Sequence, residues 1–153
     1  MHFPSLKPLS IIAMIFTFYI QHAEANTLKI TITPRQNLHT GRINDGTEIA
    51  TIHVSGMRKL CELNIWIDSA SQESKPGHYM LTNSIKRSES LIVKLSGDNW
   101  QPNTYSGRGI HLMIPEKNSD LRLLAAGEQI ISINTWPVTL TAACISPHTS
   151  RGL

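Results

Sequence analysis

The chain of 153 residues lacks most of the sequence features that accompany catalysis or metal binding. It has only two cysteines, and no two of the five histidines after residue 25 stand at metal-ligand spacing. A Gly-x-Ser-x-Gly elbow, a glycine-rich phosphate loop and an HExxH sequence are all absent. We therefore expect a protein that is not an enzyme and that holds no metal and no cofactor.

Long hydrophobic runs are also missing. The longest apolar stretch, residues 9–20, is shorter than the roughly 20 apolar residues that a transmembrane helix needs. It precedes Ala23-Glu24-Ala25, which has the small-x-small form of a signal-peptidase site. This layout predicts a secretory signal peptide over residues 1–25. The mature chain, residues 26–153, is then expected to be exported, to have no transmembrane segment and to form one domain.

A strong charge of one sign is absent as well. The chain carries 14 Lys+Arg and 11 Asp+Glu, a net charge of +3. The densest basic spot, Lys86-Arg87, is followed at once by Ser88-Glu89. Nucleic-acid binding requires a clustered basic face. The sequence therefore excludes a nucleic-acid partner.

No segment keeps a helical period over ten residues, whereas alternation with a period of two recurs along the mature region. This pattern predicts an all-β sandwich of short strands. Residues 121–126 are expected to form a helical turn or a loop. Pro137 is expected to cause a bulge or a register change in the last strand. The expected strands cover residues 28–33, 50–54, 61–68, 79–82, 91–95, 110–114 and 131–144.

The two cysteines, Cys61 and Cys144, share the parity of the apolar positions on their strands. Both sulfurs are then expected on the apolar side, where a bridge between strands can form. In an exported chain an even pair of cysteines predicts a disulfide. The closed loop would span most of the domain, and the chain-entropy model gives about 4–5 kcal/mol as an upper figure.

Three residues are candidates for contact with a partner. Trp66 lies on the polar face of its strand by parity, so it is either a surface aromatic or covered by the loop of residues 99–109. Trp100 stands in that loop. Arg108, between Gly107 and Gly109, either presents a cation or belongs to a turn whose glycines adopt positive φ. By alternation, His53 and His111 are expected on outward or rim faces.

Several motifs resemble one family. Residues 96–102, Ser-Gly-Asp-Asn-Trp-Gln-Pro, followed by Gly107-Arg108-Gly109, resemble the loop of the AfaD-type invasins. These are tip subunits of bacterial chaperone–usher polyadhesins, to which the Saf (Salmonella atypical) fimbriae belong. Residues 126–128, Ala-Gly-Glu, with the last strand are similar to the family's C-terminal block, and Cys61 with Trp66 is similar to its first-cysteine strand. Residues 134–140 are longer than the family pattern, so the register of the last strand stays open.

The resemblance implies an immunoglobulin-like sandwich that lacks its final strand. Its groove would be completed by a periplasmic chaperone and then, after assembly at the outer-membrane usher, by a donor strand from the adjacent fimbrial subunit. Leu28 begins a strand only three residues after the predicted cleavage, which leaves no room for a donor extension. The subunit would accept a strand without donating one. The expected groove residues are Leu28, Ile30, Ile32, Val138, Leu140 and Ala142.

A function follows from this resemblance. It implies a fimbrial tip subunit, secreted through the periplasm to the cell surface, that mediates adhesion to host cells or their invasion. An integrin-type receptor is implied, and no motif assigns its contact residues. The residues themselves leave another interpretation open, in which the six apolar positions are the ordinary core of a complete sandwich. The protein would then be a self-contained secreted binding or inhibitor protein.

Overall fold

A computed structural model describes residues 14–22, 28–56, 61–113, 118–132 and 134–145. The expected cleavage site at residues 23–25, Asn26 and the tail after residue 145 lie outside the described residues. Among those described, no helix has the length and hydropathy needed to cross a bilayer. Every element is a strand: β1 (Met14–His22), β2 (Lys29–Pro34), β3 (Gly41–Ile43), β4 (Glu48–Ser55), β5 (Glu62–Ile67), β6 (Ser71–Gln72), β7 (His78–Thr82), β8 (Ser90–Ser96), β9 (Gln101–Pro102), β10 (Ile110–Leu112), β11 (Asn118–Ala125), β12 (Gln129–Ile131) and β13 (Asn134–Ile145).

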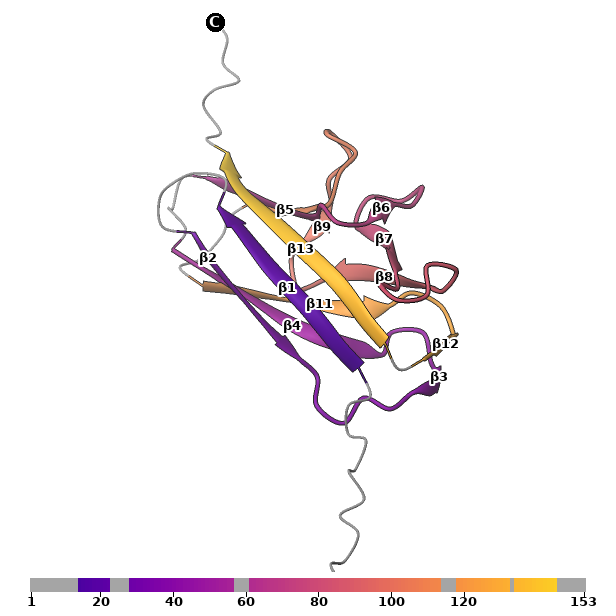
Figure 1. Ribbon diagram of the computed structural model, residues 1–153. Coiled ribbons are helices and arrows are strands. Elements are labelled where there is room, and N and C mark those ends of the chain that lie inside the picture. Colours follow the sequence, from indigo (N-terminus) through magenta and orange to yellow (C-terminus); the bar gives the residue numbers. More distant parts are fainter. Residues whose placement is uncertain (1–13, 23–27, 57–60, 114–117, 133, 146–153) are drawn as a thin grey trace, which may run out of the picture.

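The strands form two main sheets and one small ribbon (Figure 1). The first sheet has the order β1-β13-β5-β10-β9, and the second has the order β2-β4-β11-β8-β7-β6. β12 pairs with β3. Buried residues of both large sheets belong to one hydrophobic cluster, as expected when two sheets pack face to face. The prediction of an all-β sandwich is confirmed.

The core follows the alternation of the sequence. On β4, Ile52 and Val54 are buried, whereas Thr51 is exposed and His53, between the two buried residues, is half-buried. β2 is the edge strand of its sheet and ends at Pro34, where a missing N–H is tolerated. On β5 the alternation fails, because Leu63, Ile65 and the residues between them are all buried. β5 is therefore covered on both faces, which places the loop after β9 in a structural role.

The expected turn or loop at residues 121–126 is wrong. Residues 121–125 belong to β11, which lies between β4 and β8 at the centre of the second sheet. Leu121, Leu123 and Ala125 face the core with at most 1% of their surface exposed. The half-buried Leu124 hides this alternation, and the register with β4 shifts between Leu123 and Leu124. The extra residue at this shift is Ile49 of β4, which has no partner between Ala50 and Glu48, so the bulge lies in β4 opposite β11.

The bulge expected at Pro137 is also wrong. β13 runs without interruption for 12 residues, and its register with β1 is continuous through Pro137. The β5 ladder begins only at Leu140, so it requires no N–H from Pro137. The Ser69 hydroxyl donates to the Pro137 carbonyl and accepts from the Thr139 N–H. A side chain therefore continues the pairing where the neighbouring strand has ended.

The structure joins Cys61 to Cys144 in a disulfide with a Cα–Cα distance of 5.3 Å. Cys144 lies near the end of β13, and Cys61 immediately precedes β5. These two strands are antiparallel neighbours in the first sheet. The bridge therefore ties one end of β13 to the strand beside it.

Candidate functional site

The expected groove residues lie on two strands that belong to different sheets. Val138, Leu140 and Ala142 are on β13, each with at most 1% of its surface exposed. Ile30 and Ile32 are on the edge strand β2, and Leu28 directly precedes it. Ile32 is half-buried, and the other residues of the set are buried. The same side of the sandwich therefore gathers apolar residues from both sheets.

β1, which falls within the predicted signal peptide, covers this side. It pairs in parallel with β13 over nine positions, from Met14↔Asn134 to His22↔Ala142, and it also contacts β2. β1 and β13 cross the front of the molecule side by side (Figure 1). The burial of the groove residues is thus measured with β1 in place. Cleavage at residues 23–25 would leave the long edge of β13 without this partner.

Trp136 is a residue of this side that the sequence analysis did not select. It is only 1% exposed and is among the largest fully buried side chains. Its indole N–H has no hydrogen-bond partner. Alternation could have predicted this burial, because Trp136 stands two residues before Val138 and so shares its strand face. The sequence analysis did not extend the alternation past Pro137, where it expected an interruption.

The opposite edge of the same sheet carries the loop of residues 103–109, between β9 and β10. Asn103 is 4% exposed and organises this loop. Its Oδ1 accepts hydrogen bonds from the N–H groups of Tyr105 and Ser106, both at 3.1 Å. Its carbonyl accepts the Gly107 N–H, and its own N–H donates to the Gly109 carbonyl. The loop is therefore held closed by its own backbone and by one buried amide.

A second amide, from β6, holds the two glycines. The Gln72 side chain donates to the Gly107 carbonyl and accepts the Gly109 N–H at 3.0 Å. Gly107 and Gly109 have φ values of 71° and 74°, so the expected turn with positive-φ glycines is present. A Cβ on Gly109 would lie 2.1 Å from the Ile65 carbonyl oxygen. The loop is thus seated directly on the β5 backbone.

Arg108, held between these glycines, covers Trp66. Its guanidinium carbon lies 3.9 Å from the centroid of the Trp66 ring, a favourable cation–π geometry. Trp66 is 9% exposed and donates its indole N–H to Asp68 Oδ1 at 2.7 Å. The other Asp68 oxygen accepts from the Thr141 hydroxyl of β13. Of the two alternatives for Trp66, the covered residue is correct, because the loop shields its strand face.

Trp100, the other tryptophan considered as a contact residue, is also buried. Trp100 is 9% exposed, and its backbone N–H donates to the Gly97 carbonyl at 3.2 Å. This burial leaves Trp100 and Trp66 little surface for a partner.

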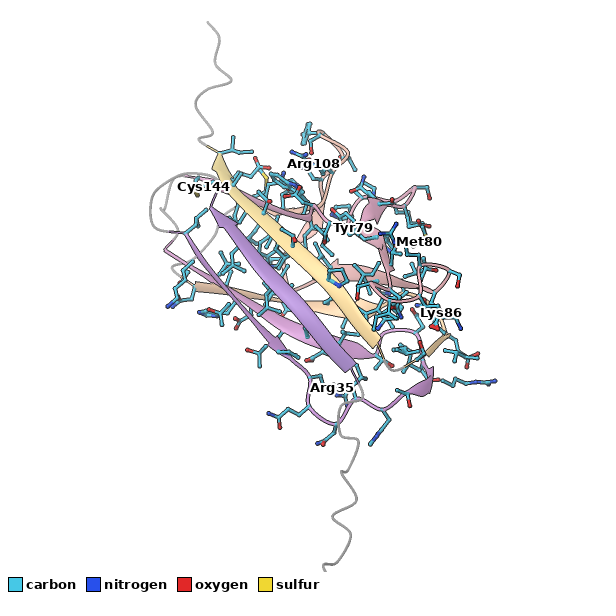
Figure 2. All side chains as sticks on the ribbon, in the orientation of Figure 1. Arg35, Tyr79, Met80, Lys86, Arg108 and Cys144 are labelled. Carbon is cyan, nitrogen blue, oxygen red and sulfur yellow. A yellow bond between two sulfur atoms is a disulfide. The ribbon has the colours of Figure 1, made fainter. Side chains whose placement is uncertain are left out.

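Tyr79 of β7 is 1% exposed, its hydroxyl has no partner, and burial raises its pKa to about 12. Tyr79 and Arg108 lie at one end of the molecule, far from Arg35 (Figure 2).

The histidines within the described ranges do not cluster in a way that suits metal binding. His53 is half-buried on β4 and lies 2.5 Å from Asp120 of β11. His111 was expected on an outward or rim face; it is 6% exposed, and its Nδ1 lies 2.6 Å from Glu62 Oε1. Its outward position on β10 is compatible with burial because the outer face of this sheet is covered. No group of three metal-binding side chains occurs among the described residues.

Comparison with known proteins finds a matching family and proteins of similar structure. The model of a family described as Enterobacteria AfaD invasin protein matches residues 38–142. Protein AggB of Escherichia coli is 26% identical over 144 residues, which cover 92% of this chain and 94% of that protein. The Salmonella SafD adhesin has a TM-score of 0.74 and 24% identity, over 80% of this chain and 86% of that one. The E. coli Hda pilus minor tip subunit, HdaB, has a TM-score of 0.71 and 17% identity, over 79% and 85%.

Proposed function

Because the chain belongs to the enterobacterial AfaD invasin family, we propose that it is the tip subunit of a chaperone–usher fimbria that accepts a donor strand along β13. The family consists of adhesive subunits with immunoglobulin-like folds, so the protein is a non-enzymatic fimbrial adhesin displayed on the bacterial surface.

The observation that carries the proposal is the position of β1. It adds a parallel strand to β13 over nine positions, and it comes from the segment expected to be removed on export. Without it, a twelve-residue strand would present unpaired N–H and C=O groups beside buried apolar side chains. Such an edge aggregates unless another strand covers it. A strand from a second chain would supply the missing cover.

The same argument indicates the partners. A periplasmic chaperone would lend the first strand, the outer-membrane usher would receive the complex, and the adjacent subunit would supply the final donor strand. β2 begins at Lys29, only three residues after Asn26. A mature chain of this kind has no free extension to donate, so it accepts a neighbour on one side only. This geometry supports a position at the fibre tip. There the subunit would meet a host receptor, which the family resemblance implies to be of the integrin type.

Native mass spectrometry of the mature chain, purified from the periplasm of its own host, tests the proposal. We expect a one-to-one complex with a second protein of periplasmic-chaperone size. A stable lone monomer with its disulfide formed would contradict the open edge. It would favour the alternative, a self-contained secreted binding or inhibitor protein.

A paired substitution locates the strand-accepting side. Leu140→Asp places a charge at a fully buried position of β13, and an unpaired buried charge is strongly destabilising. Thr139→Asp is the matched control, because Thr139 is the half-buried neighbour on the other face of the strand. We expect Leu140→Asp to abolish recovery of the complex and Thr139→Asp to preserve it. Unchanged complex formation and fibre incorporation by Leu140→Asp would refute the groove assignment.

A further inference from the structure

We propose that the loop of residues 103–109 is the receptor-contacting element, with Tyr105 and Arg108 as its contact residues and a carboxylate-bearing protein surface as its partner. The inference rests on the adhesive role proposed above and adds the place and the chemistry of the contact. Trp66 and Trp100 are then supports of the fold rather than contact residues.

The first argument is exposure. The Tyr105 side chain is 90% exposed, more than any other large hydrophobic residue described, while Trp66 and Trp100 are each 9% exposed. The exposed ring of Tyr105 offers a large apolar surface, with a polar hydroxyl at its end, that a partner can bury on binding. Tyrosine and arginine are also enriched among the residues that dominate protein–protein binding energy. The loop places one of each within four residues.

The second argument is preorganisation. Asn103 and Gln72 fix both ends of the loop, and Ser106 exchanges hydrogen bonds with the Arg108 backbone. Gly109 is in close contact with the β5 backbone, so the loop cannot shift inward. A contact loop that is rigid before binding loses less conformational entropy when the partner arrives. The network therefore holds Tyr105 and Arg108 ready for contact.

The third argument is charge. Among the described residues the ion pairs are Arg42–Glu128, His53–Asp120, Lys94–Asp45 and His111–Glu62, and Arg108 takes part in none of them. Asp68, the nearby carboxylate, is occupied by Trp66 and Thr141. The exposed Arg108 guanidinium therefore keeps its donors for an external acceptor, and a carboxylate matches its planar geometry.

The fourth argument is shape, which favours a protein over a small glycan. Sites for small ligands are concave, whereas this loop projects from the molecule above β9 (Figure 1). A projecting aromatic side chain fits a hollow on a larger partner, in the manner of long antibody loops that insert into concave surfaces. The loop also lies at the sheet edge opposite β13. A strand bound at β13 would thus leave it free.

The test is binding of the mature chain, in the form recovered from the periplasm, to cultured epithelial cells. We expect Tyr105→Ala and Arg108→Gln each to weaken binding about tenfold or more, as hot-spot residues do. The matched controls are Ile85→Ala, an apolar residue 75% exposed elsewhere, and Arg42→Gln, a cation whose side chain is 70% exposed. We expect both to bind like the unaltered protein. Protease treatment of the cells should remove binding, and sialidase treatment should preserve it.

The outcomes separate this inference from the proposed function. Binding that the two loop variants leave unchanged would overturn the loop assignment alone. Binding lost after sialidase but kept after protease would overturn the protein partner. Failure of the unaltered protein to bind would contradict the adhesive role at host cells, and the inference with it. Native mass spectrometry of each loop variant should still give the periplasmic complex, because the strand-accepting edge is untouched.

Discussion

The two edges of the five-stranded sheet differ in length and in how they are protected. At one edge β1 pairs over nine positions with the twelve-residue β13, which becomes the edge strand when β1 is removed. The other is the two-residue β9, which ends in Pro102 and continues into a loop tied down by side-chain amides. Short, proline-ended edges resist further pairing, whereas long regular edges invite it. The difference indicates that one edge is built to take up a strand and the other to refuse one.

The two edges also differ in chemistry. β13 offers buried apolar side chains and a regular backbone, which suit any strand of alternating pattern. The loop after β9 offers exposed polar and aromatic groups in one fixed arrangement, which suits a specific partner. Under the two proposals above, assembly and recognition lie at opposite edges of one sheet. Changes at one edge should leave the other intact, and the predictions below test this separation.

The largest expected effect comes from the disulfide, which anchors the end of β13. Replacing both Cys61 and Cys144 with Ala removes a crosslink with a sequence separation of 83. The free energy of unfolding should fall by about 4–5 kcal/mol at most. Denaturant unfolding of the purified complex, compared with the reduced wild-type protein as control, measures it. A loss below about 1 kcal/mol would mean that β13 is held by its packing alone.

The next effect concerns the loop edge. Gly109→Ala forces a Cβ to within 2.1 Å of the Ile65 carbonyl oxygen at a φ of 74°. Overpacking and the left-handed backbone together should cost about 3 kcal/mol. Gly107→Ala is the matched control, with a similar φ and nothing within 4 Å of the added Cβ. It should cost about 1–2 kcal/mol. Equal unfolding free energies for the two variants would contradict the seating of the loop on β5.

The smallest effect is the ionisation of Tyr79, which is buried at the same end of the sandwich as Arg108. Its pKa is raised from 10.0 to about 12, first by burial. The unfolded chain therefore releases this proton at lower pH than the folded chain. The contribution of Tyr79 to stability should be constant below pH 10 and should be lost as the pH rises from 10 toward 12. Tyr79→Phe should flatten this dependence, and Tyr105→Phe should preserve it. Denaturant unfolding at several pH values measures both variants, and a slope unaffected by Tyr79→Phe would contradict the burial.

Alternation of apolar residues was sufficient to predict the sandwich and to place β2, β4 and β8 on the chain. It failed at β11, where Leu124 interrupts the pattern beside a register shift. It also failed at Pro137, because Ser69 replaces the missing strand partner. Both failures depend on contacts between residues distant in sequence, which local patterns do not encode.

The candidate site divides in the same way. The parity of Val138, Leu140 and Ala142 predicted their burial, and Trp136 could have been added by the same rule. The glycines located the loop of residues 103–109 in the sequence, but they did not predict its conformation or its contacts. Its geometry depends on Gln72, 37 residues before Gly109, and on the stacking of Arg108 over Trp66. Pairings of this kind become visible only when the chain has folded.

Hydrogen exchange of the β13 amides tests the central claim most directly. The measurement compares the mature chain in its periplasmic complex with the same chain after the partner is removed. The β5 ladder starts at Leu140, and the backbone groups of Pro137 and Thr139 are directed to Ser69 on the β5 side. Among residues 134–138, the N–H groups that point to the outer edge, those of Asn134, Trp136 and Val138, therefore depend on a strand bound there. We predict that these amides exchange slowly in the complex and fast without the partner, while Ile110 and Leu112 of β10 are less affected. Equal protection of residues 134–138 in the lone chain would show that this edge needs no donor strand.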